Sequence, residues 1–346
     1  MSKTLQDYAT LINDTIQSNE INHYITTDNM CQNLGGIDIF KNINVPQGKV
    51  RSFQKDDVLL SNIRLYFRKV YRAKQKGGCS SDVLVFRAKH IDSATLFAIL
   101  SSQIFTDYAC LGSQGSKMPR GNKTHMMDFK IPTINFTIAK IFNSIQNKIE
   151  NNHKINELLH TLAYKIYEYY FKYKPKNAKL EQIIIENPKS SIMVKNAQKT
   201  QDKYPFFTSG DNILSYPKAI IDGRNCFLNT GGNAGIKFYV GKASYSTDTW
   251  CICANEFSDY LYLLLSSIKT HINQSFFQGT SLKHLQKNLL KKYPIYMPSA
   301  HEIKKFNQII MPLLTLISIN TRTSKKLEQI RDFLLPLLLK QQVKPQ

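Results

Sequence analysis

Two long stretches of the chain carry apolar residues at alternating spacings of three and four. The first predicts a helix over about residues 138–172, and the second predicts a helix over about residues 300–342. Each apolar stripe contains one asparagine, Asn152 or Asn320. Such an asparagine sets the register if it is buried between two helices, and it is a plain surface residue if it lies at an exposed edge. Pro312 and Pro336 are expected to bend or end the second helix.

Two helices with one apolar stripe each can bury those stripes against each other. The sequence therefore predicts an antiparallel helix pair, a coiled coil. The residues expected at the helix-pair interface are Ile141, Ile145, Asn152, Ile155, Leu159, Leu162, Ile310, Ile317, Asn320 and Leu327.

Outside these helices, short β-rich runs alternate with turn residues, and the order of the motifs repeats. "LFAILSS" (96–102) returns as "LYLLLSS" (261–267), "CSSDVLV" (79–85) as "YSTDTWC" (245–251), and "SQGSK" (113–117) is echoed in "FQGTSLK" (277–283), each time about 165 residues later. The predicted fold class is α/β. We expect two mixed α/β domains, residues 1–137 and 177–299, separated by two long antiparallel helices, residues 138–176 and 300–342, in a pseudo-twofold internal repeat.

The charge balance points to a polyanionic partner. The chain has 46 Lys and Arg against 25 Asp and Glu, a formal net charge of +21, which favours nucleic acid first and a membrane surface second. Apolar runs stay short of the ~20 residues that span a bilayer, and the first residues lack a signal-peptide pattern. We expect a cytoplasmic protein without a membrane partner, whose six cysteines are reduced thiols.

Catalytic and metal-binding motifs are not apparent. "NTGGNAGIKFYVGKAS" (229–244) is rich in glycine, but it lacks the Gly spacing and the Ser or Thr of a phosphate-binding loop. The cysteines have no zinc-site spacing, and the histidines are scattered. We expect neither catalysis nor a metal nor a cofactor in this chain.

Several motifs together resemble a known family, the specificity subunit of type I restriction-modification systems. They include "YITTDNM" (24–30), "DDVLLSNIRLYFRKV" (56–70), "GGCSSDVLVFR" (77–87) and "SKMPRGN" (116–122) in the first half, with "LNTGGNAG" (228–235), "GTSLKHLQ" (279–286) and "LEQIRDFLLPLLL" (327–339) in the second. The similarity extends over nearly the whole chain.

The resemblance implies two target recognition domains that read a bipartite, asymmetric site on double-stranded DNA, held apart by the helix pair. It also implies a scaffold for two modification (methyltransferase) subunits, which use S-adenosylmethionine. In the full complex, two restriction subunits that use ATP with magnesium would join them.

Candidate DNA-binding residues follow from their chemistry, since basic side chains neutralise phosphates and polar side chains read base edges. Phosphate contacts are expected from Arg68, Lys69, Arg72, Lys74 and Lys76. Base-edge contacts are expected from Ser80, Ser81, Lys117, Arg120 and Asn122 in the first domain, and from Asn233, Lys237, Ser246, Thr247, Lys283 and His284 in the second. Arg64, which lies among apolar residues, is expected to pair with Asp82 or Asp57 inside the domain.

Two other interpretations remain open. The chain could be the recognition module of a fused or type II-like modification enzyme. Alternatively, it could be a non-catalytic coiled-coil scaffold with incidental DNA affinity. The duplication of a whole block, with small polar residues before each strand, favours sequence recognition, because a scaffold has no need of two such blocks.

Overall fold

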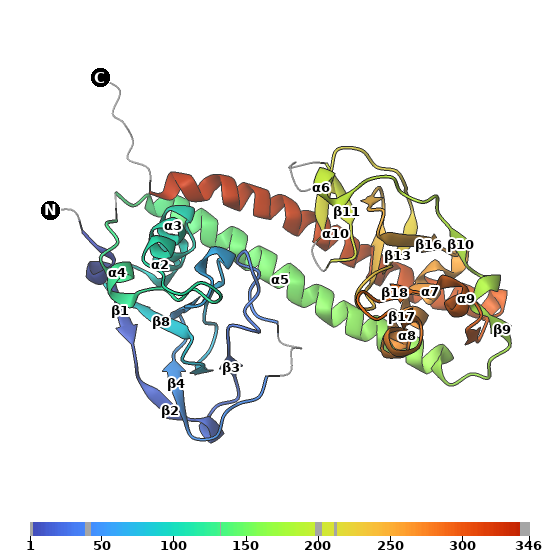
Figure 1. Ribbon diagram of the computed structural model, residues 1–346, viewed down its shortest axis with the longest axis horizontal. Helices are drawn as coiled ribbons and strands as arrows, with labels where there is room; N and C mark the ends of the chain where they lie inside the picture. Colours follow the sequence, from blue (N-terminus) through green and yellow to red (C-terminus); the bar gives the residue numbers. More distant parts are fainter. Residues whose placement is uncertain (1–2, 39–42, 132, 198–202, 211–212, 340–346) are drawn as a thin grey trace. The chain divides into compact units, whose positions relative to one another are not determined.

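The computed structural model describes residues 3–38, 43–131, 133–197, 203–210 and 213–339. The chain forms two compact units (Figure 1). Unit 1 comprises Met1–Glu150 and Lys326–Gln346, and unit 2 comprises Asn151–Lys325. Each unit thus contains a globular part together with a portion of each long helix. The sequence predicted four consecutive segments instead.

The globular part of unit 1 contains two four-stranded sheets. The first has the strand order β1 (Ala9–Ile12), β8 (Val83–Ala88), β5 (Val58–Ser61), β6 (Val70–Arg72), with all neighbours antiparallel. The second has the order β2 (Thr15–Gln17), β4 (Lys49–Phe53), β7 (Gly77–Cys79), β3 (Tyr24–Ile25), and its β3–β7 pair is parallel. Its short helices are α1 (Leu5–Tyr8), α2 (Ser93–Leu100), α3 (Gln103–Leu111) and α4 (Lys123–Met127).

Unit 2 repeats this plan. Its main sheet has the antiparallel order β10 (Ile185–Glu186), β16 (Thr249–Cys253), β13 (Arg224–Asn229), β14 (Ile236–Val240). A second sheet has the order β12 (Leu214–Tyr216), β11 (Tyr204–Phe207), β15 (Ser244–Tyr245), with β11–β15 parallel. The remaining elements are α6 (Val194–Ala197), α7 (Ser258–Ser267), α8 (Lys269–Ser275), α9 (Lys287–Lys291) and the two-stranded pairs β17 (Phe277–Gln278) with β18 (His284–Leu285) and β9 (Ala178–Lys179) with β19 (Pro294–Ile295).

The repeated heptapeptides form the matching core helices. In unit 1, α2 packs on β5, β6 and β8, and its residues Leu96 to Leu100 are buried. In unit 2, α7 packs on β13 and β14 through buried residues from Tyr260 to Leu265. Such continuous apolar runs are typical of a helix that is covered on most of its surface. The predicted mixed α/β repeat is therefore confirmed.

The two long helices are α5 (Phe136–Tyr167), which continues into a π-helical turn, η3 (Glu168–Lys172), and α10 (Ala300–Leu338). Within unit 2, Asn152 contacts Ser324 and Phe171 contacts Phe306. Within unit 1, Gln146 contacts Arg331 and the N–H of Asn135 donates to Leu338 O. Partner numbers fall along α10 as they rise along α5, so the predicted antiparallel pairing is confirmed in both units.

Of the residues predicted on α5, Asn152 is buried as expected, but the apolar ones are not. Ile141, Ile155 and Leu162 are 41–49% exposed, and Ile145 and Leu159 are only partly buried. The buried positions of α5 are Ala139, Phe142, Gln146, Ile149, Asn152, Ala163 and Tyr167. Part of this face packs on the globular parts: Phe142 lies against Phe97, and Tyr167 lies against Tyr260. The face also contains small and polar residues, which apolar periodicity does not single out.

On α10 the prediction was closer. Ile310 and Ile317 are buried, and Asn320 and Leu327 are partly buried. Asn152 is buried, and the Asn320 side-chain amide donates to Asn156 Oδ1 at 3.0 Å, so both asparagines lie at helix contacts. Pro312 does not end the helix, and Pro336 lies two residues before its end.

In the described part of the chain, no helix is both long enough and apolar enough to cross a membrane on its own. The α2–α3 pair, bent by 60°, meets the criterion by length and composition alone.

Candidate nucleic-acid interface

A short loop, residues 114–120 (loop 1), follows α3 in unit 1. Its ends are joined by two backbone hydrogen bonds, Gln114 N to Arg120 O at 2.9 Å and Arg120 N to Gln114 O at 2.8 Å. Gly115 has a φ of +101°, a conformation that favours glycine. Beneath the loop, Arg64 N donates to Pro119 O at 2.9 Å, and Gly121 N donates to Asn62 O at 3.1 Å. Loop 1 is therefore held in place by the chain segment that follows β5.

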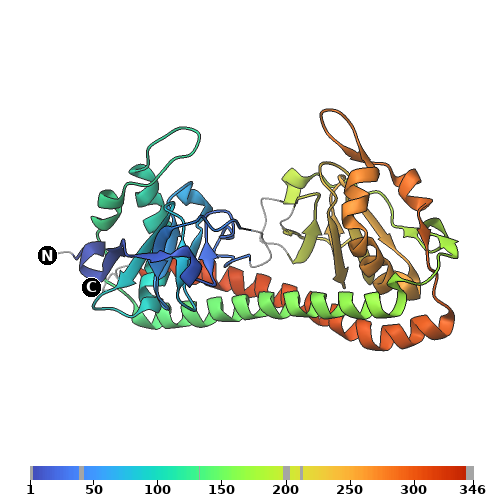
Figure 2. The ribbon, with the colours of Figure 1, turned by 90° about the horizontal axis from the view of Figure 1, so that it is seen from below.

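Unit 2 contains an equivalent loop, residues 278–284 (loop 2). Gln278 and His284 face each other in the β17–β18 pair, and Gly279 has a φ of +140°. Gly232 N donates to Lys283 O at 2.9 Å, and Leu285 N donates to Thr230 O at 3.0 Å. These bonds come from the segment that follows β13, the counterpart of β5. The two loops are thus built by the same hydrogen-bond pattern, and Figure 2 shows each on the side of its own unit away from the long helices.

Cationic side chains lie on both loops. Lys117 is exposed, and the Arg120 side chain is 60% exposed while its guanidinium forms an ion pair with Asp82 at 3.0 Å. Lys283 and His284 are exposed on loop 2. These four predicted residues are accessible to DNA. The Asn122 side chain instead caps α4, since its Oδ1 accepts a hydrogen bond from His125 N.

The repeated tetrapeptides "CSSD" and "YSTD" form equivalent turns. Ser80 N donates to Ile25 O, and Ser80 O accepts from Val83 N. The backbone of Ser246 makes the same bonds, with Phe207 O and Thr249 N. Ser246 is 0% exposed, so its predicted base-edge contact is wrong. Ser80 and Thr247 are partly buried in this turn, whereas Ser81 is exposed.

The aspartates that end these motifs also take part through their backbone. The carbonyl of Asp82 accepts from Asn62 N at 2.7 Å, and that of Asp248 accepts from Thr230 N at 3.2 Å. Each turn therefore supports the segment on which its loop rests, by the same backbone hydrogen bonds in both units.

Most basic side chains of residues 68–76 make hydrogen bonds or ion pairs within unit 1. Arg68 donates to Ser101 O at 2.9 Å, and burial lowers its pKa. Lys69 donates to Thr27 O, Arg72 lies 3.8 Å from Asp56, and Lys74 lies 3.1 Å from Glu150. Arg68 is therefore a structural residue and not the expected phosphate contact. Lys76 is exposed.

The predicted pairing of Arg64 with Asp82 or Asp57 is also wrong. Asp82 pairs with Arg120, and Asp57 accepts two hydrogen bonds of 2.8 Å from Arg87. Arg64 instead donates from Nη2 to Lys117 O at 3.3 Å, and so supports loop 1.

In unit 2, the Lys237 side chain donates hydrogen bonds inside its own domain, as Arg68 does in unit 1. Its Nζ donates to Thr208 O at 2.8 Å and to Asn229 Oδ1 at 3.3 Å, which contradicts its predicted role at a base edge. Asn233 is exposed, and its backbone carbonyl accepts from the Asn229 side chain.

Two short helices next to the loops supply lysines that the sequence analysis missed. Lys123 is exposed at the start of α4, directly after loop 1. In the equivalent α9, Lys287 and Lys291 lie over the Trp250 ring, and Lys291 pairs with Glu186. Burial lowers the pKa of Lys287. Each of these helices follows its loop. Aligning the two repeats in the sequence would therefore have matched α4 with α9.

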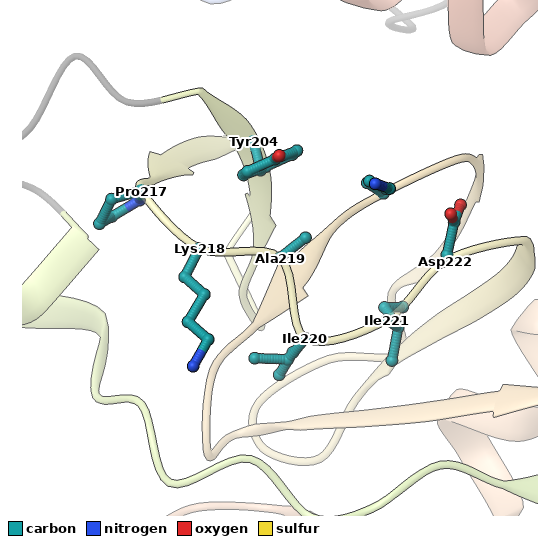
Figure 3. A pocket seen from close by; sticks show the side chains of 8 residues that line it. Tyr204, Pro217, Lys218, Ala219, Ile220, Ile221 and Asp222 are labelled. Carbon is teal, nitrogen blue, oxygen red and sulfur yellow. The ribbon is translucent and has the colours of Figure 1, made fainter.

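A hollow of about 530 Å³ lies elsewhere on unit 2, at the start of β13, the end opposite to loop 2. Figure 3 shows the segment from Pro217 to Asp222 along one wall, near Tyr204. Its charged residues are Lys218, Lys242 and Asp222. A single carboxylate with two lysines and a tyrosine does not form a recognisable acid–base pair or nucleophile.

No group of three or more His, Cys, Asp or Glu that could hold a metal ion occurs within the described ranges. All six cysteines are free, and burial raises the pKa of Cys79 to about 12. Such a thiol stays protonated and unreactive at neutral pH.

The comparison with protein families gives a match in the second half of the chain. The family described as "Type I restriction modification DNA specificity domain" matches residues 176–329. The chain carries a type I restriction-modification DNA specificity domain. This specificity domain includes the main sheet of unit 2, α7, loop 2, α9 and most of α10.

One solved structure extends the likeness in fold beyond the specificity domain. The S subunit of a type I restriction-modification system from M. genitalium is 14% identical, with a TM-score of 0.64, over 99% of this chain and 96% of that one. The HsdS subunit from Thermoanaerobacter tengcongensis is also 14% identical, over 98% and 96% of the two chains, with a TM-score of 0.37. A comparison with curated protein sequences gave no match. The M. genitalium likeness shows a shared fold over nearly the whole chain, including unit 1.

Proposed function

We propose that this chain is the DNA specificity subunit of a type I restriction-modification complex, in which unit 1 and unit 2 each read one part of a bipartite site. The observation that carries the proposal is the pair of equivalent loops. Each is fixed by the same backbone hydrogen bonds and carries exposed cations, beside or within a DNA specificity domain. Rigid loops with accessible basic side chains suit both phosphate contact and base readout.

Affinity and specificity arise from different parts of this surface. The net charge of +21 supplies attraction to any DNA sequence, which weakens steeply as salt rises. Discrimination requires side chains at base edges, and the two loops differ there: loop 1 reads "SKMPR" where loop 2 reads "TSLKH". The two half-sites should therefore differ in sequence, which gives an asymmetric site.

Catalysis in this proposal belongs to partner subunits. Two modification subunits would bring S-adenosylmethionine, and two restriction subunits would use ATP with magnesium. The complex would act on double-stranded DNA in the cytoplasm. Exposed apolar side chains on the long helices, such as Leu158 at 61% and Phe333 at 72%, are suitable for contacts with protein partners.

The deciding experiment maps methylated bases in a host that carries the modification subunit, with and without this chain. We expect one bipartite sequence to be methylated only when the chain is present. The purified complex should then bind that duplex at least about a thousandfold more tightly than random duplex at physiological salt.

Equal affinity for all sequences would contradict the proposal and favour a scaffold with incidental DNA affinity. Methylation by the chain alone would instead favour a fused modification enzyme. The control is the same host with a chain in which Lys117, Arg120, Lys283 and His284 are all replaced by alanine.

A further inference from the structure

The two loops share an exposed apolar residue at the same position. Met118 is 56% exposed on loop 1, and Leu282 is 57% exposed on loop 2. Each stands three residues after the glycine with positive φ and two residues before the end of its loop, Arg120 or His284. The neighbouring positions differ. When the two loops are aligned, Lys117 corresponds to Ser281 and Pro119 corresponds to Lys283.

These side chains are held out from the domain by rigid backbone. In unit 1 the residue after Met118, Pro119, accepts a hydrogen bond from Arg64 N at 2.9 Å. In unit 2 the residue after Leu282, Lys283, accepts one from Gly232 N at 2.9 Å. An isolated exposed apolar residue needs no explanation, but two at equivalent positions of two separately anchored loops suggest a common use.

The surroundings of both side chains match DNA better than a protein surface. Lys117, Arg120 and Lys123 lie on or next to loop 1, and Lys283, His284 and Lys287 lie on or next to loop 2. An apolar side chain among cations fits a nucleic acid, whose phosphates attract the cations while its bases offer apolar faces and thymine methyl groups. Met and Leu are also among the residues that proteins insert between base steps.

We infer that Met118 and Leu282 are specificity-determining residues that make apolar contacts with the bases, each with its own half-site. This inference rests on the proposed function and adds the contact that the basic residues cannot supply. Lys117, Arg120, Lys283 and His284 can contact DNA phosphates or base edges, and the apolar side chain adds a contact with base faces or thymine methyl groups.

The test uses the complete complex with its modification subunits, and duplexes that carry the mapped site, a version with the first half-site altered, and a version with the second altered. Discrimination is the ratio of affinities for the intact and the altered duplex. Met118→Ala is expected to lower discrimination at the half-site read by unit 1 about 5- to 10-fold and to leave the other half-site unchanged. Leu282→Ala is expected to do the reverse.

Matched controls are Ile104→Ala in unit 1 and Leu289→Ala in unit 2, which remove exposed apolar side chains outside the loops (44% and 45% exposed). They should change neither ratio. Complex assembly is followed by analytical ultracentrifugation, and folding by circular dichroism, because side chains this exposed should not affect either.

Each alternative result overturns the inference. If discrimination is unchanged in both variants, the two side chains do not contact the bases. If binding weakens equally on all duplexes, they contribute only to general affinity for DNA. Loss of assembly assigns the loops to a protein partner. A failure of the proposed function would give a different result, because the unaltered complex itself would then show no discrimination between the duplexes.

Discussion

The side-chain amide of Asn152 donates a hydrogen bond to the hydroxyl of Ser324, 3.1 Å away, where α5 and α10 pack in unit 2. Asn152 is 1% exposed and Ser324 is 2% exposed. A buried polar pair costs little while it is intact, but each partner depends on the other. It also favours one register of the helix pair, since sliding either helix would bury unpaired polar atoms.

Replacing Asn152 by alanine should destabilise unit 2 by about 1–3 kcal/mol, because the amide is lost and a cavity remains. Urea unfolding followed by circular dichroism would measure this change. The double variant with Ser324→Ala should cost less than the sum of the two single variants. Strict additivity would show that the two side chains do not interact.

Ser246→Ala tests whether the repeated turn is structural. The Ser246 hydroxyl is buried 3.1 Å from Thr249 Oγ1, so its removal should lower stability by about 1 kcal/mol without changing DNA discrimination. Lys283→Ala is the comparison, since it should weaken binding to all sequences and lower the salt dependence by about one ion. A change in sequence preference with Ser246→Ala would restore the earlier interpretation of this serine as a base reader.

Arg331 holds the end of α10 to unit 1. It is 2% exposed, and its guanidinium donates to Gln146 Oε1 at 3.0 Å and to Asn33 O at 3.4 Å. Arg331→Ala should expose residues 30–34 and 146–150 to faster amide hydrogen exchange and lower the stability of unit 1 by about 1–3 kcal/mol. Lys326→Ala, on an exposed position of the same helix, is the control and should exchange as the unaltered chain does. Equal exchange in both variants would contradict the role of Arg331.

Glu302 caps the start of α10 in a pH-dependent way. Its carboxylate accepts hydrogen bonds from Ser299 N at 2.9 Å and from the Tyr296 hydroxyl, and these bonds lower its pKa to about 2. A lowered folded-state pKa gives stability that is complete above the unfolded value of about 4.5 and is lost as the pH falls toward 2.

Glu302→Gln should therefore be less stable than the unaltered chain at pH 7 by about 0.5–1 kcal/mol, a modest value because the site is open to solvent. The difference should shrink as the pH falls below about 4.5. Thermal unfolding across this pH range would show it, and a difference that grows in acid would refute the assignment. Glu328→Gln, at a partly buried position of the same helix, provides a comparison.

The internal repeat could be predicted from the sequence because it shows directly in the order of the motifs along the chain. The two main sheets have the same strand order, and β5 and β8 recur as β13 and β16 about 165 residues later. Each second sheet contains one parallel pair, β3–β7 or β11–β15. The helix seam was predicted less well, since apolar content favoured Ile141 and Ile155 and missed Gln146, whose partner Arg331 lies on α10. Polar residues with partners on the opposite helix are satisfied when buried, and a partner distant in sequence cannot be read from periodicity.

The candidate site shows the same limit. Charge alone selected Arg68 and Lys237, yet both donate to backbone carbonyls inside their domains. A basic side chain reaches DNA only if nothing nearer accepts its hydrogen bonds, and that depends on tertiary neighbours. Met118 and Leu282 were overlooked for the opposite reason, because apolar residues in a basic sequence are ordinarily assigned to the core.

The division of the long helices between the units has a consequence for synthesis of the protein. Unit 1 takes Leu335 and Leu338 of α10, and Leu339 directly after the helix, into its core, whereas unit 2 is one continuous segment. On the ribosome, the first unit to emerge must therefore wait for residues 151–325 to be made, on the order of ten seconds or more at about 5–20 residues per second. Unit 2 can close first, and the unit translated first is completed last.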